Sequence, residues 1–68
     1  MSAVFCDRLR SARHERWMTQ AEFARRTGIN RSMLNKYEHG TQKPAMDNLI
    51  AMARTLDCSL DWLCGLED

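Results

Sequence analysis

The sequence has few cysteines, and they lack the spacing of a disulfide framework or a metal site. Its 68 residues contain three cysteines, at positions 6, 58 and 64, with no CxxC pair. An odd, unpaired set fits reduced thiols better than a disulfide scaffold. Neither His14 nor His39 has metal-ligand spacing around it. We therefore expect Cys6 and Cys58 to be small core residues, with no metal and no cofactor.

Long apolar runs are also missing. No stretch approaches the roughly 20 apolar residues that a membrane-spanning helix needs, and the N-terminus lacks the charged-then-apolar pattern of a secretion signal. We therefore expect a cytoplasmic protein without membrane contact. A chain of 68 residues forms one domain at most, covering residues 1–68, and has little room for an enclosed catalytic cleft.

Proline and glycine are scarce, and their positions indicate helix ends. The three glycines, Gly28, Gly40 and Gly65, each follow a stretch with helical periodicity, where a left-handed cap ends a helix. No stretch shows the two-residue alternation of a strand, and no Asn-Gly or Asp-Gly hairpin turn occurs. The sequence therefore predicts an all-α fold, a compact arrangement of five helices.

The apolar periodicity and the capping residues set the expected helix bounds. Thr19 and Glu22 form an S/T-x-x-E capping box, and Asn30 is a good N-cap for the following helix. Ala45 stands at an N-cap position without a side-chain acceptor. The expected helices cover about Ala3–Arg16, residues from Gln20 to the stop at Gly28, Arg31–His39, Met46–Leu56, and a short segment after Ser59.

Charge is unevenly distributed along the chain. Residues 1–46 carry nine Lys or Arg against four acids, a balance of +5, and residues 47–68 carry one Arg against five acids, a balance of −4. The net charge of +1 is by itself weak evidence for a nucleic-acid partner, because phosphates attract local positive charge. The split predicts a polarised molecule with one basic side available to an anion.

The expected helices before and after Gly28 have the spacing of a helix-turn-helix at about residues 20–39. Several runs resemble the phage-repressor/Cro-type (XRE-like) helix-turn-helix family, and the resemblance covers nearly the whole chain. They are TQAEFA at 19–24, GIN at 28–30, Leu34, YEHG at 37–40, Lys43-Pro44 and LDWL at 60–63. One departure is Trp17, which stands where a small residue is more common, so that aromatic packing and exposure both remain open.

The resemblance implies a lambda-repressor-like fold and a role for each matching residue. Side chains implied to face base edges in the major groove are Arg31, Ser32, Asn35 and Lys36. Residues implied to contact phosphates are Gln20, His39, Thr41 and Lys43. Arg13 and Glu38 match positions that form a structural ion pair inside the domain. Met33 remains ambiguous between packing and contact with a thymine methyl group.

These roles imply a sequence-specific transcriptional regulator. We expect a repressor that binds a palindromic operator in double-stranded DNA as a homodimer, because two recognition helices about 34 Å apart match one DNA turn. Contact with RNA polymerase would allow activation instead. The expected dimer interface consists of Leu60, Trp62, Leu63 and Leu66.

Three alternatives remain at this stage. An antitoxin with a toxin partner, or a restriction-modification controller, would have the same fold and also bind DNA. A protein-interaction domain without DNA binding is favoured by the low net charge. An enzyme is not expected, because no Ser-His-Asp, Cys-His or paired-carboxylate set is visible.

Overall fold

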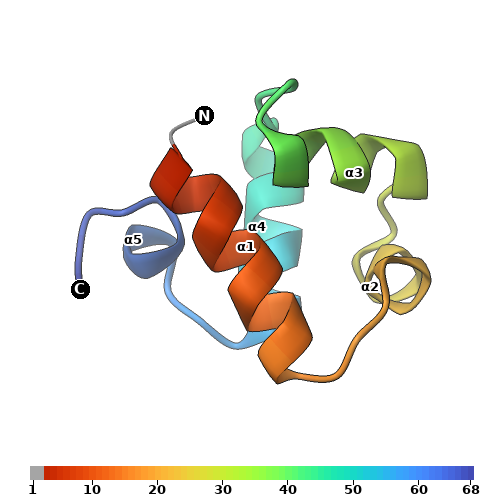
Figure 1. The fold of residues 1–68 in the computed structure, drawn as a ribbon, viewed down its shortest axis with the longest axis horizontal. Coiled ribbons are helices and arrows are strands. Elements are labelled where there is room, and N and C mark those ends of the chain that lie inside the picture. Colours follow the sequence, from red (N-terminus) through yellow and green to blue (C-terminus); the bar gives the residue numbers. More distant parts are fainter. Residues whose placement is uncertain (1–2) are drawn as a thin grey trace.

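The computed structural model describes residues 3–68, and over this range the chain forms five helices and no strand. The helices are α1 (Ala3–Glu15), α2 (Gln20–Thr27), α3 (Arg31–His39), α4 (Met46–Leu56) and α5 (Leu60–Leu63). Figure 1 shows α1 in front of α4, with α3 across the top, α2 at the right and α5 at the left. The all-α prediction is confirmed, and the expected bounds of α3 and α4 agree with the structure.

The core lies where α1 to α5 converge, and each helix contributes from one face. In α1 the buried residues Phe5, Leu9 and Ala12 recur at intervals of three or four, the spacing of a single helical face. Complete burial of one such large apolar side chain contributes about 1.5–3 kcal/mol. The largest fully buried apolar side chains are Phe5, Leu9, Phe23, Leu34, Met52, Leu56 and Leu63.

The turns after α2 and α3 depend on glycine. Gly28 has φ 73° and Gly40 has φ 77°, a left-handed conformation that side chains other than glycine's disfavour. At Gly40 a Cβ atom would also lie 3.2 Å from the sulfur of Cys6. Cys6 is buried, as expected, and its thiol lies 3.5 Å from the carbonyl oxygen of Tyr37. Cys58 is only half-buried.

Only one of the two hydrogen bonds of the predicted capping box forms at the start of α2. The Thr19 hydroxyl accepts a hydrogen bond from the Glu22 amide at 3.1 Å. The Glu22 carboxylate faces the other way, 3.5 Å from Arg25 and 3.0 Å from Arg26. These pairs lie three and four residues apart on the helix surface, where opposite charges attract. The return bond to the cap amide, which the sequence predicted, is therefore replaced by ion pairs within α2.

Trp17 occupies the turn between α1 and α2 and is 93% exposed. Its φ is 58°, so a bulky residue holds a left-handed conformation that is usually left to glycine. The buried side chain next to it, Met18, packs into the core instead. Of the two readings that the sequence left open for Trp17, the structure shows exposure. Ala45, as expected, caps α4 without a side-chain hydrogen bond.

Arg8 fastens the C-terminal segment to α1. Its guanidinium donates to the backbone oxygen of Trp62 and, at 2.7 Å, to that of Glu67. The same group lies 4.9 Å from the centre of the Trp62 ring, a cation–π distance. The hydroxyl of Ser59 also donates to the Glu67 carboxylate. Both the backbone oxygen and the ring of Trp62 therefore contact Arg8 of the same chain.

Within residues 3–68, no helix is both long and apolar enough to cross a membrane.

Candidate nucleic-acid interface

The connection between α2 and α3 is short and internally hydrogen-bonded. The amide of Gly28 donates to the Ala24 carbonyl at 2.9 Å, and Ile29 is buried at the corner. The Asn30 side chain then accepts from the amides of Ser32 at 2.8 Å and Met33 at 3.4 Å. These bonds satisfy amides that the start of a helix leaves free. The direction of α3 relative to α2 is therefore fixed locally.

A pocket of about 330 Å³ lies between the start of α2 and the exposed face of α3. We call it the α2–α3 pocket, and it is lined by Gln20, Arg31, Ser32, Asn35 and Lys36. The four α3 residues are exposed and share one face because positions i, i+1, i+4 and i+5 lie close together on a helix. The opposite face of α3, with Leu34 and Tyr37, is buried in the core.

The positive charges near this pocket are unpaired. Within residues 3–68, Arg31, Lys36 and Lys43 form no ion pair. Several cations elsewhere are neutralised: Arg10 lies 2.6 Å from the Asp7 carboxylate, and Arg25 and Arg26 pair with Glu22. Between Glu22 and Asp47 the only acid is Glu38, which is buried. The exposed face of α3 therefore presents to an anion positive charge that no protein acid compensates.

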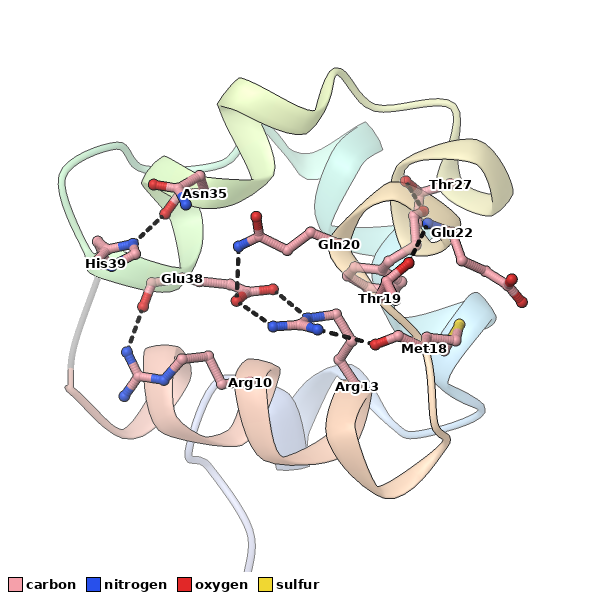
Figure 2. Close-up of polar contacts among 11 residues, drawn as sticks. Arg10, Arg13, Met18, Thr19, Gln20, Glu22, Thr27, Asn35, Glu38 and His39 are labelled. Atoms are coloured by element: carbon pink, nitrogen blue, oxygen red, sulfur yellow. Dashed lines mark hydrogen bonds and ion pairs between the residues drawn. The ribbon is translucent and has the colours of Figure 1, made fainter.

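A polar cluster around the buried Glu38 carboxylate joins α1, α2 and α3 and includes Gln20, which lines the pocket (Figure 2). The Glu38 carboxylate accepts from Arg13 through two bonds, 2.7 Å from Nε and 2.9 Å from Nη2. The same carboxylate accepts from the Gln20 side chain at 3.2 Å. The third Arg13 nitrogen, Nη1, donates to the Met18 carbonyl at 2.9 Å, and Arg10 donates to the Glu38 carbonyl at 2.8 Å. Charge-assisted, two-point bonds of this kind are directional, so α1, α2 and α3 are held at fixed relative positions.

The remaining candidate residues lie at the far end of α3 and beyond it. His39 is exposed, and its Nδ1 lies 2.8 Å from the Asn35 carbonyl oxygen. Thr41 donates to the Lys36 carbonyl through its amide at 3.0 Å and its hydroxyl at 3.4 Å. Lys43 is exposed in the loop before α4. None of these residues lines the α2–α3 pocket. Met33 is half-buried against the core, which favours packing over contact with a base.

The bracing of Gln20 by Glu38 could not be found from the sequence, because 18 residues separate the two. The neutralised cations could have been identified: Arg10 follows Asp7 by three residues, and Arg26 follows Glu22 by four. Helical spacings of three and four bring such pairs together. Applying that rule leaves the cations of α3, Arg31 and Lys36, without a local acidic partner.

Two short helices joined through a glycine turn, the second with an exposed basic face, define a helix-turn-helix domain. The family model described as Helix-turn-helix matches residues 9–63. The chain belongs to this family, in its XRE-type, phage-repressor-like branch. Membership confirms the expected class, a DNA-binding helix-turn-helix domain.

The curated relatives of this chain are named as transcriptional regulators. The chain is 37% identical over 65 residues to the HTH-type transcriptional regulator YobD of Bacillus subtilis, covering 96% of this chain and 58% of that protein. It is 41% identical over 59 residues to the cryptic phage CTXphi transcriptional repressor RstR of Vibrio cholerae, covering 87% of this chain and 53% of that protein. The chain thus spans little more than half the length of these relatives.

Solved structures share the fold along nearly their whole length. The P22 c2 repressor in complex with a synthetic operator superimposes with a TM-score of 0.84 at 27% identity, covering 88% of this chain and 91% of that one. The restriction-modification controller protein C.AhdI from Aeromonas hydrophila superimposes with a TM-score of 0.83 at 29% identity, covering 90% and 94%. These likenesses confirm the lambda-repressor-like arrangement of the five helices.

Proposed function

We propose that this chain is a cytoplasmic transcriptional repressor domain that binds a palindromic DNA operator as a homodimer. The N-terminal half of α3 enters the major groove, and residues 1–68 act as one domain. The observation that carries the proposal is the α2–α3 pocket, where four exposed α3 side chains and Gln20 meet and where the cations have no acidic partner. The solved complex of the P22 c2 repressor with its operator supports it through the shared fold.

The residues of α3 differ in what they can recognise. Arg31 and Lys36 carry the donors that suit guanine O6 and N7. Asn35 offers a donor and an acceptor, the pair that suits adenine N6 and N7. Ser32 is short and bonds to several bases, so it adds less discrimination. We assign sequence recognition to these four side chains.

The flanking residues position the domain on the DNA backbone. Gln20 begins α2, where free amides and the helix dipole attract a phosphate, and its bond to Glu38 links that phosphate contact to α3. His39, at the end of α3, and Thr41 and Lys43, in the loop after it, contact phosphates beyond the pocket. Phosphate contacts fix the register without distinguishing sequences.

A homodimer follows from size and geometry. One small domain makes few base contacts, and helix-turn-helix dimers place two recognition helices about 34 Å apart, one DNA turn. The Cα extents of this domain are 27 × 23 × 19 Å, so two copies side by side fit over successive turns of the major groove. The bound dimer represses by occupying a promoter; contact with RNA polymerase would make it an activator.

A restriction-modification controller is the second candidate. The specific observation that favours it is the likeness to C.AhdI, which covers 94% of that chain, so a controller of this family can be as small as this chain. Both candidates use the α2–α3 pocket in the same way. A restriction endonuclease gene next to the gene for this chain would favour the controller.

Two alanine variants test the proposed assignment of base contacts and phosphate contacts to different residues. Arg31→Ala is expected to weaken binding to a preferred operator by about 1–3 kcal/mol per half-site and to relax the preference at one base position. Lys43→Ala is expected to weaken binding to every sequence alike. It is also expected to reduce the slope of log affinity against log salt by the amount that about one phosphate contact per protomer contributes. Fluorescence anisotropy with the operator and its single-base variants measures both effects. If the two variants change the base preferences in the same way, the assignment of base and phosphate contacts is wrong.

A further inference from the structure

His39 is the last residue of α3, and a hydrogen bond to the backbone one turn earlier holds its exposed ring. Its Nδ1 lies 2.8 Å from the carbonyl oxygen of Asn35, and Figure 2 shows this contact at the end of α3. A carbonyl oxygen accepts hydrogen bonds and has no hydrogen to donate, so Nδ1 carries the hydrogen. The bond therefore sets which ring nitrogen is the donor when the ring is neutral.

The neutral form of this ring has no hydrogen to offer a phosphate. A neutral imidazole has one N–H group and one nitrogen lone pair. With the hydrogen on Nδ1, the other nitrogen, Nε2, carries the lone pair, and two acceptors form no hydrogen bond. Protonation gives Nε2 a hydrogen and the ring a positive charge, so that its bond to a phosphate becomes charge-assisted. The phosphate contact of His39 therefore requires the imidazolium form.

The protein itself supplies no counterion for a charged His39. Within residues 3–68, His39 forms no ion pair. The Glu38 carboxylate is buried and bonded to Arg13. Lys36 and Lys43 are unpaired and repel a further positive charge, whereas a phosphate attracts all three. The charged groups on the elements around His39 are Lys36 and Glu38 of α3, Arg10 and its partner Asp7 of α1, Lys43 of the loop, and Asp47 of α4.

We propose that His39 takes up a proton when the domain binds DNA, so that DNA binding strengthens as the pH falls. A histidine side chain gains or loses its charge between about pH 5 and 8. At low pH the ring already carries the proton that the phosphate contact needs, and at high pH that proton must come from the solvent, so the affinity falls as the pH rises. The inference rests on the proposed function, because it concerns the phosphate contact of His39, and it adds regulation of that contact by pH.

Binding of random-sequence duplex DNA at two pH values tests the inference. At constant salt, fluorescence anisotropy is expected to give an affinity at least about tenfold higher at about pH 6 than at about pH 8. The slope of log affinity against log salt is expected to be steeper at the lower pH by about 0.9 for each protomer, because each imidazolium is one more cation on a phosphate. Calorimetric titration in two buffers of different ionisation enthalpy counts the protons, and we expect uptake of up to about two per dimer near pH 7.

Two substitutions of His39 separate the effect of its proton from other effects of pH. His39→Gln cannot be protonated, and we expect it to bind DNA at both pH values about as weakly as the unmodified chain does at pH 8. His39→Lys is charged at both pH values, and we expect it to bind about as tightly as the unmodified chain does at pH 6. His14→Gln is the matched control and retains the pH dependence, because His14, the other histidine of the chain, is exposed on α1 outside the proposed DNA contacts. Circular dichroism at both pH values checks the fold of each variant.

The inference is overturned if the pH dependence of DNA binding persists in His39→Gln, or if His14→Gln removes it. It is also overturned if the unmodified chain binds duplex DNA equally well at both pH values, and in that case the proposed function still stands. A chain that binds no DNA at either pH, even at about 50 mM salt, where phosphate contacts are strongest, contradicts the proposed function as well.

Discussion

Replacing Arg13 with methionine is expected to lower the free energy of unfolding by about 3–5 kcal/mol, because it leaves a buried carboxylate without its charged partner. Glu38 is 1% exposed, and Arg13 supplies both of the bonds shorter than 3 Å that its carboxylate accepts. The remaining side-chain donor, Gln20, is uncharged and lies 3.2 Å away. Since domains of this kind are stable by about 5–15 kcal/mol, the loss is large. Urea unfolding followed by circular dichroism measures it.

A double variant distinguishes the destabilisation caused by the unpaired charge from that caused by the loss of packing. Arg13→Met combined with Glu38→Leu removes both charges, and we expect it to recover most of the lost stability, because an apolar pair can replace a buried ion pair at little cost. Glu38→Leu alone leaves Arg13 unpaired and is expected to be destabilising. An Arg13→Met protein that unfolds at the same urea concentration as the unmodified chain contradicts the bracing role that we assign to the cluster.

Raising the salt concentration is expected to weaken DNA binding by several orders of magnitude. Only cations displace counterions from the DNA, and Arg31, Lys36 and Lys43 provide three per protomer, or six in a dimer, each of which adds about 0.9 to the slope of log affinity against log salt. Between about 50 and 200 mM salt the affinity for random-sequence duplex DNA is expected to fall about 10³- to 10⁵-fold. Fluorescence anisotropy over a series of salt concentrations gives the slope.

A double variant, Arg31→Ala with Lys36→Ala, reports on the cations of the α2–α3 pocket in the same titration, and Arg25→Ala is its matched control. Arg25 is a surface cation already paired with Glu22, so its loss is expected to change the binding less than the loss of the unpaired cations. Absence of binding even at about 50 mM salt, where phosphate contacts are strongest, would favour a protein-interaction domain and contradict a DNA-binding role.

The local parts of the fold were predictable from the sequence because the signals lie within a few residues of what they determine. Asn30 caps α3 through the amides two and three positions ahead. Gly28 and Gly40 end their helices because the left-handed conformation suits glycine. For the same reason, helical spacing within α3 was enough to predict which of its side chains share the exposed face.

Long-range contacts were not predictable in the same way. The bond from Arg8 to Trp62 spans 54 residues, and no periodicity in either segment indicates it. Leu63 and Leu66 look alike in the sequence, yet one is fully buried and the other 78% exposed, because only the packing of α5 against the other helices decides which faces the core. Leu63 therefore has no surface with which to contact a partner, and that part of the expected dimer interface is wrong. The partnership of Arg13 with Glu38 came from the family resemblance and not from spacing.

The central claim is that the exposed face of α3, with the α2–α3 pocket, selects a DNA sequence. Selection of bound duplexes from a random pool by the unmodified chain tests it most directly. We predict enrichment of a symmetric sequence whose two half-sites have centres about 10 base pairs apart, one turn of DNA, and loss of the preference at one position of each half-site with Arg31→Ala. Recovery of a pool as random as the starting one would contradict the claim.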